Sequence, residues 1–360
     1  TTDGQTISFS AMTQSEAATL GKDVTPALRV TAMTVNTGDG VTIGGIYGVP
    51  GPTETVSSTT NPFSLRTQSA TGDLAPDYVE VRVVEGQLGQ PGAVVELTGQ
   101  LAGERMADPS GPTVPLQVSV RLRDVVGVGQ WGYGPSGFFP QWLLPEQRTA
   151  VMSQYGGDVG AYLEATGEPL TDQGSYYYSS PVMEVESFTI AEGGTVVASG
   201  TDGELIADYV TQSFDAAAAA VVEGGVQWTE FSTLLDGDRT MKVGEVEQST
   251  VGTLPYAIEL RADGHRLANG SLEASQRWPI GSITITPDTS ATWTSPRSGK
   301  TYVMRYTAEL KGHEGSGSAS LTYEAVHDDQ ELVVAGRTVY EGLYRVTGTL
   351  DGASVNGYAW

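Results

Sequence analysis

Short runs that alternate apolar and polar residues, each closed by a glycine-containing turn, restrict most strongly how this 360-residue chain can fold. Residues 172–211 show the pattern well. In the run VMEVESFTI, polar residues separate four apolar ones, as in a half-buried strand: Val182, Val185, Phe188 and Ile190. Glu192-Gly193-Gly194 then indicates a hairpin turn, because glycine accepts positive φ without steric cost. The segment therefore predicts three strands joined by tight turns.

The same segment also concentrates aromatic and acidic residues. It contains four tyrosines, and its last ten residues contain three acids: Tyr176, Tyr177, Tyr178, Tyr209, Asp202, Glu204 and Asp208. One interpretation is an ordinary hairpin with solvated carboxylates, since isolated carboxylates usually face water. The other is the mouth of a pocket, where aromatic rings form the wall and a partly buried acid supplies a proton or a hydrogen bond.

Alternating runs recur before and after this segment, which predicts an all-β protein built from antiparallel barrels or sandwiches. At about 100–200 residues per domain, the chain is long enough for two domains. We place an N-terminal β domain at residues 1–215 and a C-terminal β-barrel domain at residues 216–360. The alanine-rich residues 213–225 favour a short helix that connects the two domains.

The strand period is lost in residues 127–145, where aromatic residues and glycines dominate. A helix is predicted to begin at Pro145 and to break near Gly156-Gly157. We therefore predict a helical insertion around residues 127–170. It is either a lid or binding loop, or a helix that plugs one end of the sheet. Its aromatic residues are candidates for substrate binding: Trp131, Tyr133, Phe138, Phe139 and Trp142.

Charge and composition exclude several classes of function. A net charge of −24 disfavours nucleic acid and anionic membrane surfaces as partners. No apolar run approaches the ~20 residues of a transmembrane helix, so we expect a soluble chain. The chain has no cysteine, which excludes disulfides and thiol catalysis. Its polar start is not a signal peptide, and secretion after removal of such a peptide stays open.

Metal and cofactor motifs are not recognisable in the sequence. The three histidines, His265, His313 and His327, have no ligand spacing, which argues against a zinc site or a Ser-His-Asp triad. There is no P-loop or dinucleotide-binding motif, so no cofactor is predicted. Four aspartates admit a calcium site but are better explained as solvated turn residues: Asp236, Asp238, Asp328 and Asp329. We therefore predict no metal site.

Residues 172–360 resemble the lipocalin-like carotenoid 1,2-hydratase/AttH superfamily, which includes the kievitone hydratases and the fungal decalin-forming Diels–Alderases. The matching motifs are SYYYSSP, WTEFSTLLDGD, ATWTSPRSGKTYVMRYTAEL and the terminal VYEGLYRVTGTLDGASVNGYAW. The resemblance implies two lipocalin-like β domains with an apolar ligand pocket between them. Hydratases of the group carry an Asp-His pair followed by a Trp near the end of the first domain. Here Asp208 is kept, whereas Tyr209 replaces the His and the Trp is missing, which argues against acid-catalysed alkene hydration.

Three functions follow from the residues and the resemblance. The first is a cyclase of Diels–Alderase type in natural-product biosynthesis. It would fold an apolar polyene or polyketide between the two domains, with a tyrosine hydroxyl or Lys242 as hydrogen-bond donor. The second is a hydratase or proton-initiated cyclase of a prenyl or terpenoid alkene, with Asp208 as a general acid of raised pKa. The third is a carrier of an apolar small molecule without catalysis.

These functions define a set of candidate residues. The catalytic candidates are Asp208, Tyr209, Glu204 and Tyr178. The substrate-binding candidates, beyond the aromatic residues of the insertion, are Tyr176, Trp228, Trp293 and Tyr340. The oligomeric state is left open.

Overall fold

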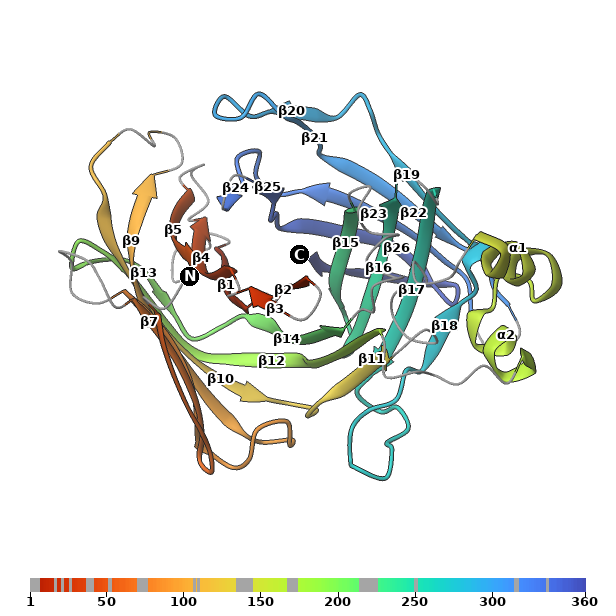
Figure 1. Ribbon diagram of the computed structural model, residues 1–360, viewed down its shortest axis with the longest axis horizontal. Coiled ribbons are helices and arrows are strands. Elements are labelled where there is room, and N and C mark those ends of the chain that lie inside the picture. Colours follow the sequence, from red (N-terminus) through yellow and green to blue (C-terminus); the bar gives the residue numbers. More distant parts are fainter. Residues whose placement is uncertain are drawn as a thin grey trace.

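The chain folds almost entirely into antiparallel β-sheet, which confirms the predicted all-β class (Figure 1). The computed structural model describes residues 7–15, 18–20, 23–25, 28–36, 42–50, 54–69, 77–105, 108, 111–133, 145–166, 174–213, 226–248, 252–313, 317–334 and 337–360. Within these residues, twelve strands form a first sheet and nine form a second.

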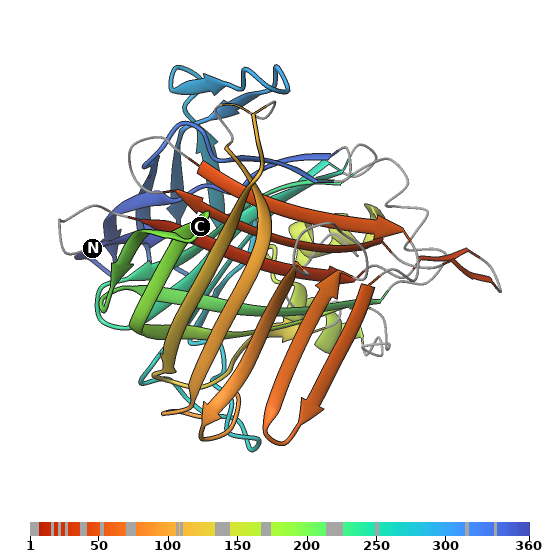
Figure 2. The same cartoon turned by 90° about the vertical axis from the view of Figure 1, so that its left-hand side faces the viewer.

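The first sheet consists of β1 (Ser8–Ser15), β4 (Leu28–Asn36), β5 (Thr42–Pro50), β6 (Glu54–Thr60), β7 (Phe63–Ser69), β8 (Tyr78–Glu85), β9 (Val94–Arg105), β10 (Val114–Asp124), β11 (Gly129–Tyr133), β12 (Gly174–Glu192), β13 (Thr195–Gly200) and β14 (Glu204–Ser213). Its main path runs β1-β4-β5-β9-β10-β12-β11, and Figure 2 shows β6 to β9 side by side. Alternate residues of β10 enter its core: Leu116, Val118, Val120 and Leu122.

The second sheet consists of β15 (Val226–Leu235), β16 (Arg239–Gln248), β17 (Gly252–Arg261), β18 (Gln276–Trp278), β19 (Ile283–Pro287), β22 (Arg305–Leu310), β23 (Ala319–Ala325), β26 (Tyr344–Leu350) and β27 (Ala353–Ala359). Its order is β18-β17-β16-β15-β27-β26-β23-β22-β19. Its core contains Phe231, Met241, Val243, Tyr323 and Val346. Each fully buried side chain of this size stabilises the fold by about 1.5–3 kcal/mol.

Three two-stranded sheets complete the strands: β2 (Ala18–Leu20) with β3 (Asp23–Thr25), β20 (Thr292–Thr294) with β21 (Thr301–Val303), and β24 (Glu331–Val334) with β25 (Arg337–Tyr340). A short 3-10 helix covers Ile280–Ser282. We keep the division after residue 215 as a proposal. The strands of the first sheet end at Ser213, and those of the second begin at Val226.

The long strand β12 links the two halves of the molecule. It pairs with β10, β11, β13 and β14, and in Figure 1 it runs between β10 and β14 toward β16 and β17. Its register with β14 shifts between Ser180 and Met183, around Pro181, because proline cannot donate to the ladder. The carbonyl of Pro181 accepts instead from Thr240 Oγ1 of the second sheet, at 3.2 Å.

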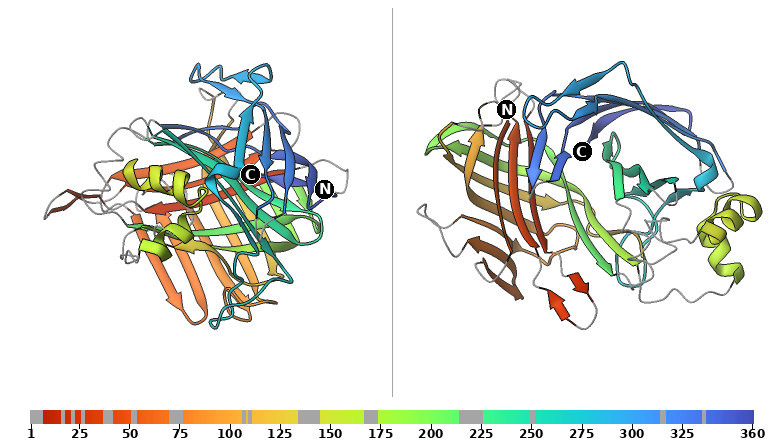
Figure 3. Two further views of the ribbon diagram at one scale, coloured as in Figure 1. Left: turned by 90° about the vertical axis from the view of Figure 1, so that its right-hand side faces the viewer. Right: turned by 45° about the horizontal axis from the view of Figure 1, so that its top comes forward.

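The predicted insertion contains two helices and one strand. Helix α1 (Pro145–Gln154) begins at the expected proline, and α2 (Val159–Thr166) follows the break at Gly156-Gly157. Both lie beside the C-terminal half in Figure 3, where the amide of Ile280 donates to the carbonyl of Gly157 at 3.0 Å. The prediction that residues 127–145 contain no strand is wrong, because β11 pairs with β12. The predicted helical connector lies outside the described residues.

The two sheets meet in a separate apolar cluster. Val126, Trp131, Tyr177 and Val182 come from the first half of the chain. They pack against Val246, Tyr256, Ile258, Leu260 and Leu272 from the second half. The outer face of β16 and β17 is therefore covered by β11 and β12. Neither described helix has the length and apolar character required to cross a membrane.

Candidate active site

An ion cluster lies where β14, β15 and β16 approach β12. On β15, alternate residues Phe231 and Leu235 face the barrel core, which leaves Glu230 and Ser232 on the opposite face. Lys242 of β16 lies directly across from Ser232 in the antiparallel register. Because cross-strand partners point to the same face of a sheet, Lys242 also faces the first sheet.

The ammonium group of Lys242 is surrounded by four oxygen atoms. Its Nζ donates to Tyr177 Oη at 2.6 Å, Asp208 Oδ2 at 2.6 Å and Glu230 Oε1 at 3.0 Å. Ser232 Oγ is the fourth neighbour. The Lys242 side chain is 0% exposed, and its Nζ lies 4.5 Å from the centroid of the Tyr177 ring. The ammonium is therefore sealed from solvent and is held by polar groups of both sheets.

Hydroxyl and indole donors fix the two carboxylates in place. Tyr177 Oη donates to Asp208 Oδ2 at 2.7 Å, and Ser179 Oγ donates to Asp208 Oδ1. The indole Nε1 of Trp131 donates in turn to Ser179 Oγ. Tyr256 Oη donates to Glu230 Oε2 at 2.8 Å. Every contact that Asp208 makes here is with a donor, which is the environment of an ionised carboxylate.

The charges of the cluster follow from burial and proximity. Burial lowers the pKa of Lys242, but the nearby carboxylates of Asp208 and Glu230 raise it by more, so the lysine stays charged. Burial, together with the same carboxylates, raises the pKa of Tyr177 well above its usual value. Burial and Glu230 do the same for Tyr256. Both tyrosines are therefore neutral donors, and one ammonium faces two carboxylates.

A further acid, Glu341, borders this cluster. Burial raises its pKa, the charge of Glu230 raises it further, and Lys242 acts in the opposite direction. Its Oε2 accepts a hydrogen bond of 3.0 Å from the indole Nε1 of Trp360. Glu341 is thus more easily protonated than an ordinary glutamate.

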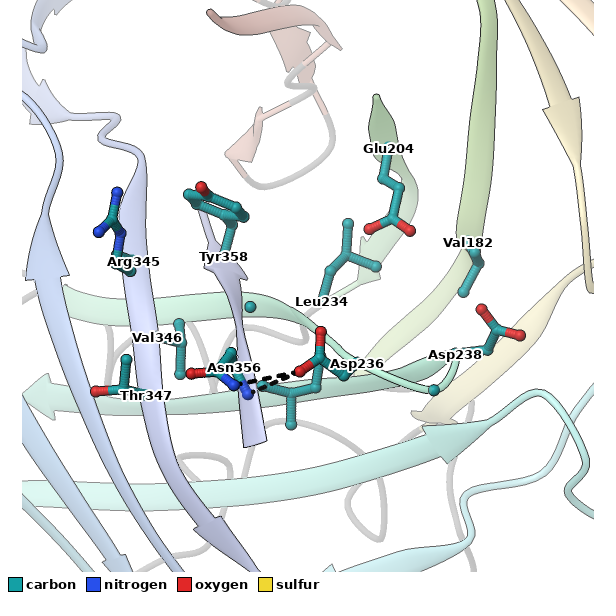
Figure 4. A pocket seen from close by; sticks show the side chains of 13 residues that line it. Val182, Glu204, Leu234, Asp236, Asp238, Arg345, Val346, Thr347, Asn356 and Tyr358 are labelled. Atoms are coloured by element: carbon teal, nitrogen blue, oxygen red, sulfur yellow. Dashed lines mark hydrogen bonds between the residues drawn. The ribbon is translucent and has the colours of Figure 1, made fainter. Parts of the chain in front are cut away.

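A cavity of about 450 Å³ lies on the same face, further along the strands (Figure 4). It is lined by Val182, Glu204, Leu234, Leu235, Asp236, Gly237, Asp238, Arg345, Val346, Thr347, Asn356, Gly357 and Tyr358. Leu234 follows Ser232 on the same face of β15, and Glu204 lies four residues before Asp208 on β14. The carboxylates of Asp208 and Glu230 keep 31% and 19% of their side-chain surface exposed. They are therefore the members of the cluster that a ligand can reach.

The four catalytic candidates separate in the structure. Asp208 is in the ion cluster, and Glu204 lines the cavity, where burial and the surrounding acids raise its pKa. Tyr209 lies on the other face of β14, bonded to Ser180, and burial raises its pKa to about 12. Tyr178 is partly buried opposite Tyr209 in the β12–β14 register. The structure therefore brings Asp208 together with Tyr177, the neighbour of Tyr178.

The aromatic candidates also have different surroundings. Trp131 is fully buried in the apolar cluster between the sheets and does not line the cavity. Trp228 is 62% exposed on β15. Trp293 stacks near Tyr302, and Tyr340 Oη donates to the carbonyl of His327 at 2.8 Å. The side chains of Tyr133 and Tyr176, and residues Phe138, Phe139 and Trp142, lie outside the described part of the chain.

Several residues of the cluster do not emerge from the sequence. Lys242 is predicted only as an alternative hydrogen-bond donor, and Glu230, Ser232 and Tyr256 have no recognisable motif. The segment Thr240-Met241-Lys242-Val243 alternates, which ordinarily places a lysine in solvent. A signal does exist for Tyr177, since it belongs to the tyrosine triplet that the pocket interpretation singles out.

Comparison with known proteins identifies a related fold. Neither the protein-family models nor the curated proteins give a match. A solved structure from Nitrosomonas europaea, provisionally assigned as an AttH, superposes with a TM-score of 0.61 at 16% identity, covering 100% of this chain and 88% of that chain. Kievitone hydratase from Nectria haematococca gives a TM-score of 0.43 at 14% identity, covering 92% and 83%. The first likeness shows a shared lipocalin-like fold.

Proposed function

We propose that this chain is an enzyme of the hydratase type, which adds water across a carbon–carbon double bond of a small organic substrate or removes water from an alcohol to form one. One observation carries the proposal. The partly exposed Asp208 carboxylate is held by Lys242, Tyr177 and Ser179, and Glu204, four residues before it on β14, lines a cavity. A buried charge cluster costs several kcal/mol of desolvation, which a carrier or a reaction driven by shape does not require.

Asp208 fits the role of a base better than that of an acid. A carboxyl that protonates an alkene must carry a proton, whereas the donors around Asp208 suit its ionised form. A carboxylate can accept a proton from water as the water oxygen attacks carbon. An isolated alkene does not accept such a nucleophile. The geometry therefore favours an alkene conjugated to a carbonyl group.

The atoms of this step balance without a co-reactant. Water forms a C–O bond at the carbon β to the carbonyl while Asp208 takes one of its protons. The electron pair of the double bond moves toward the carbonyl oxygen as an enolate. The proton then passes from Asp208 to the α carbon, and the carboxylate is regenerated. Lys242 is buried and acts as a positioning residue, which orients Asp208 through a hydrogen bond of 2.6 Å.

Hydration of conjugated substrates in oxygen-18 water tests this proposal. Purified protein is incubated with a panel of α,β-unsaturated carbonyl compounds, and labelled alcohols are detected by mass spectrometry. We expect Asp208→Asn to lower the rate by about 10²–10⁴-fold. Asp263→Asn, the same change at an exposed turn, serves as the control. Full activity of Asp208→Asn, or no hydration of any compound, contradicts the proposal.

The cyclase and the carrier predicted from the sequence depend on an apolar enclosure. The aromatic residues expected to build it, Phe138, Phe139 and Trp142, lie outside the described part of the chain. The same variants separate these functions from the hydratase. Cyclisation of a linear polyene at an equal rate by wild type and Asp208→Asn would support the pericyclic reaction. Tight binding without turnover would support the carrier.

A further inference from the structure

Arg345 differs from most arginines of this acidic protein in its surroundings. The chain has 43 acidic and 19 basic residues, and arginines such as Arg239, Arg297 and Arg305 pair with carboxylates. Within the described residues, Arg345 takes part in no recorded ion pair or hydrogen bond. It is exposed and lines the cavity. Its cross-strand neighbour on β23, Glu324, is paired with Arg305, so the guanidinium of Arg345 is available to a ligand.

The sheet register places Arg345 on the same face as the ion cluster. Arg345 of β26 is opposite Tyr358 of β27, and Tyr358 is opposite Leu234 of β15. Cross-strand partners share a face, so all three side chains project into one space, as Figure 4 shows. Two interstrand spacings separate β26 from β15, which puts Arg345 about 10 Å from β15 at the level of Leu234. Ser232 lies two residues, or about 7 Å, further along that strand.

The other side of the cavity has the opposite charge. Glu204, Asp236 and Asp238 line it, and Asp236 already accepts hydrogen bonds from the main chain and side chain of Asn356. The charges of Asp236 and Asp238 contribute to the raised pKa of Glu204, after burial. A negatively charged ligand is repelled at this side and attracted at Arg345. The cavity therefore favours one orientation for an anion.

We propose that Arg345 binds the carboxylate of the substrate. If the proposed hydratase function holds, the substrate is an elongated organic acid whose carboxylate lies at least about 12 Å from the double bond that reaches Asp208. Leu234, Val182 and the ring of Tyr358 contact the apolar middle of the molecule. Guanidinium groups suit this role because their parallel N–H donors match the two carboxylate oxygens.

Binding of a fluorescent acid and its neutral analogue tests the proposal. The probes are dansylaminohexanoate and the corresponding amide, which have the same shape and differ in charge. We expect wild type to bind the acid about 10-fold or more tightly than the amide. Arg345→Gln should weaken binding of the acid by about 10–100-fold and leave the amide within about 2-fold. Arg82→Gln, the same change at an exposed arginine of the first sheet that does not line the cavity, should alter neither.

Three results would overturn this assignment: no binding of the acid by wild type, equal affinity for acid and amide, or an equal loss of both in Arg345→Gln. The readout is separate from catalysis. Asp208→Asn is expected to keep the preference for the acid while losing hydration. Hydration without any preference for the acid refutes the role of Arg345 alone, and a preference without hydration refutes the hydratase function alone.

Discussion

Replacement of Lys242 by methionine tests whether the ion cluster holds the two sheets together. Methionine has a similar length and no charge, so Lys242→Met removes the ammonium and keeps most of the packing. Asp208 and Glu230 then remain at the junction with only neutral donors such as Tyr177. We expect the free energy of unfolding to fall by about 2–4 kcal/mol.

The magnitude follows from the contacts of Lys242 with its two carboxylates. Unit charges separated by the 2.6 Å between Lys242 Nζ and Asp208 Oδ2 attract by about 6 kcal/mol at an effective dielectric constant of about 20. Desolvation of the ammonium offsets much of this attraction. Removing one partner of a fully buried pair costs about 3–5 kcal/mol. Here the carboxylates of Asp208 and Glu230 are 31% and 19% exposed, so water solvates them in part and lowers the expected loss.

Urea unfolding followed by tryptophan fluorescence measures the change, with Trp131 as a buried reporter at the junction. The comparison variant combines Lys242→Met with Asp208→Asn and Glu230→Gln, which removes all three charges. We expect this triple variant to recover at least half of the lost stability, since no uncompensated charge remains. A single variant within about 0.5 kcal/mol of wild type refutes the reasoning, as does a triple variant no more stable than the single one.

Three further predictions concern the cavity, the junction and a strand pair. The pKa of Glu204 is higher in the folded protein than in the unfolded chain. The folded protein therefore loses stability as the pH rises from the pKa of the unfolded state through that of the folded state. Glu204→Gln should therefore melt higher than wild type near neutral pH and lose this advantage below about pH 4, as measured by calorimetry. Trp131→Phe removes the donor to Ser179 and should cost about 1–3 kcal/mol in urea unfolding. Gly357→Ala would place Cβ 1.9 Å from the carbonyl oxygen of Leu234, so it should lower the melting temperature, whereas Gly299→Ala, with open space around it, should cost only about 1 kcal/mol.

Much of the fold could be predicted because its strands are half-buried. The regular alternation in β10 reflects one apolar core, and a helix start at Pro145 needs only local chemistry. β11 could not be predicted, because Gly129–Tyr133 has no alternation. Its pairing with β12 depends on Trp131 entering the cluster between the sheets, which is a tertiary contact. The alternation of apolar and polar residues therefore does not predict a strand whose two faces are covered by different neighbours.

The residues of the candidate site could likewise be predicted only where the signal is local in the sequence. Asp208 could be singled out because acids and aromatic residues gather in one local segment, whereas Lys242 lies 34 residues further along the chain. Period-two alternation places Lys242 on the outer face of its barrel, and this is correct. The outer face is nevertheless buried, because β11 and β12 cover it. The sequence pattern of one barrel contains no information about that cover.

The lysine also changes which chemistry Asp208 can perform. The sequence resemblance of residues 172–360 predicts a histidine after Asp208, and this chain has Tyr209 there instead. Tyr209 lies on the opposite face of β14, bonded to Ser180, so it cannot act on a ligand at Asp208. Asp208 instead accepts a hydrogen bond from the Lys242 ammonium at 2.6 Å. A reaction that begins with an ionised Asp208 is therefore favoured over one that begins with protonation of an alkene.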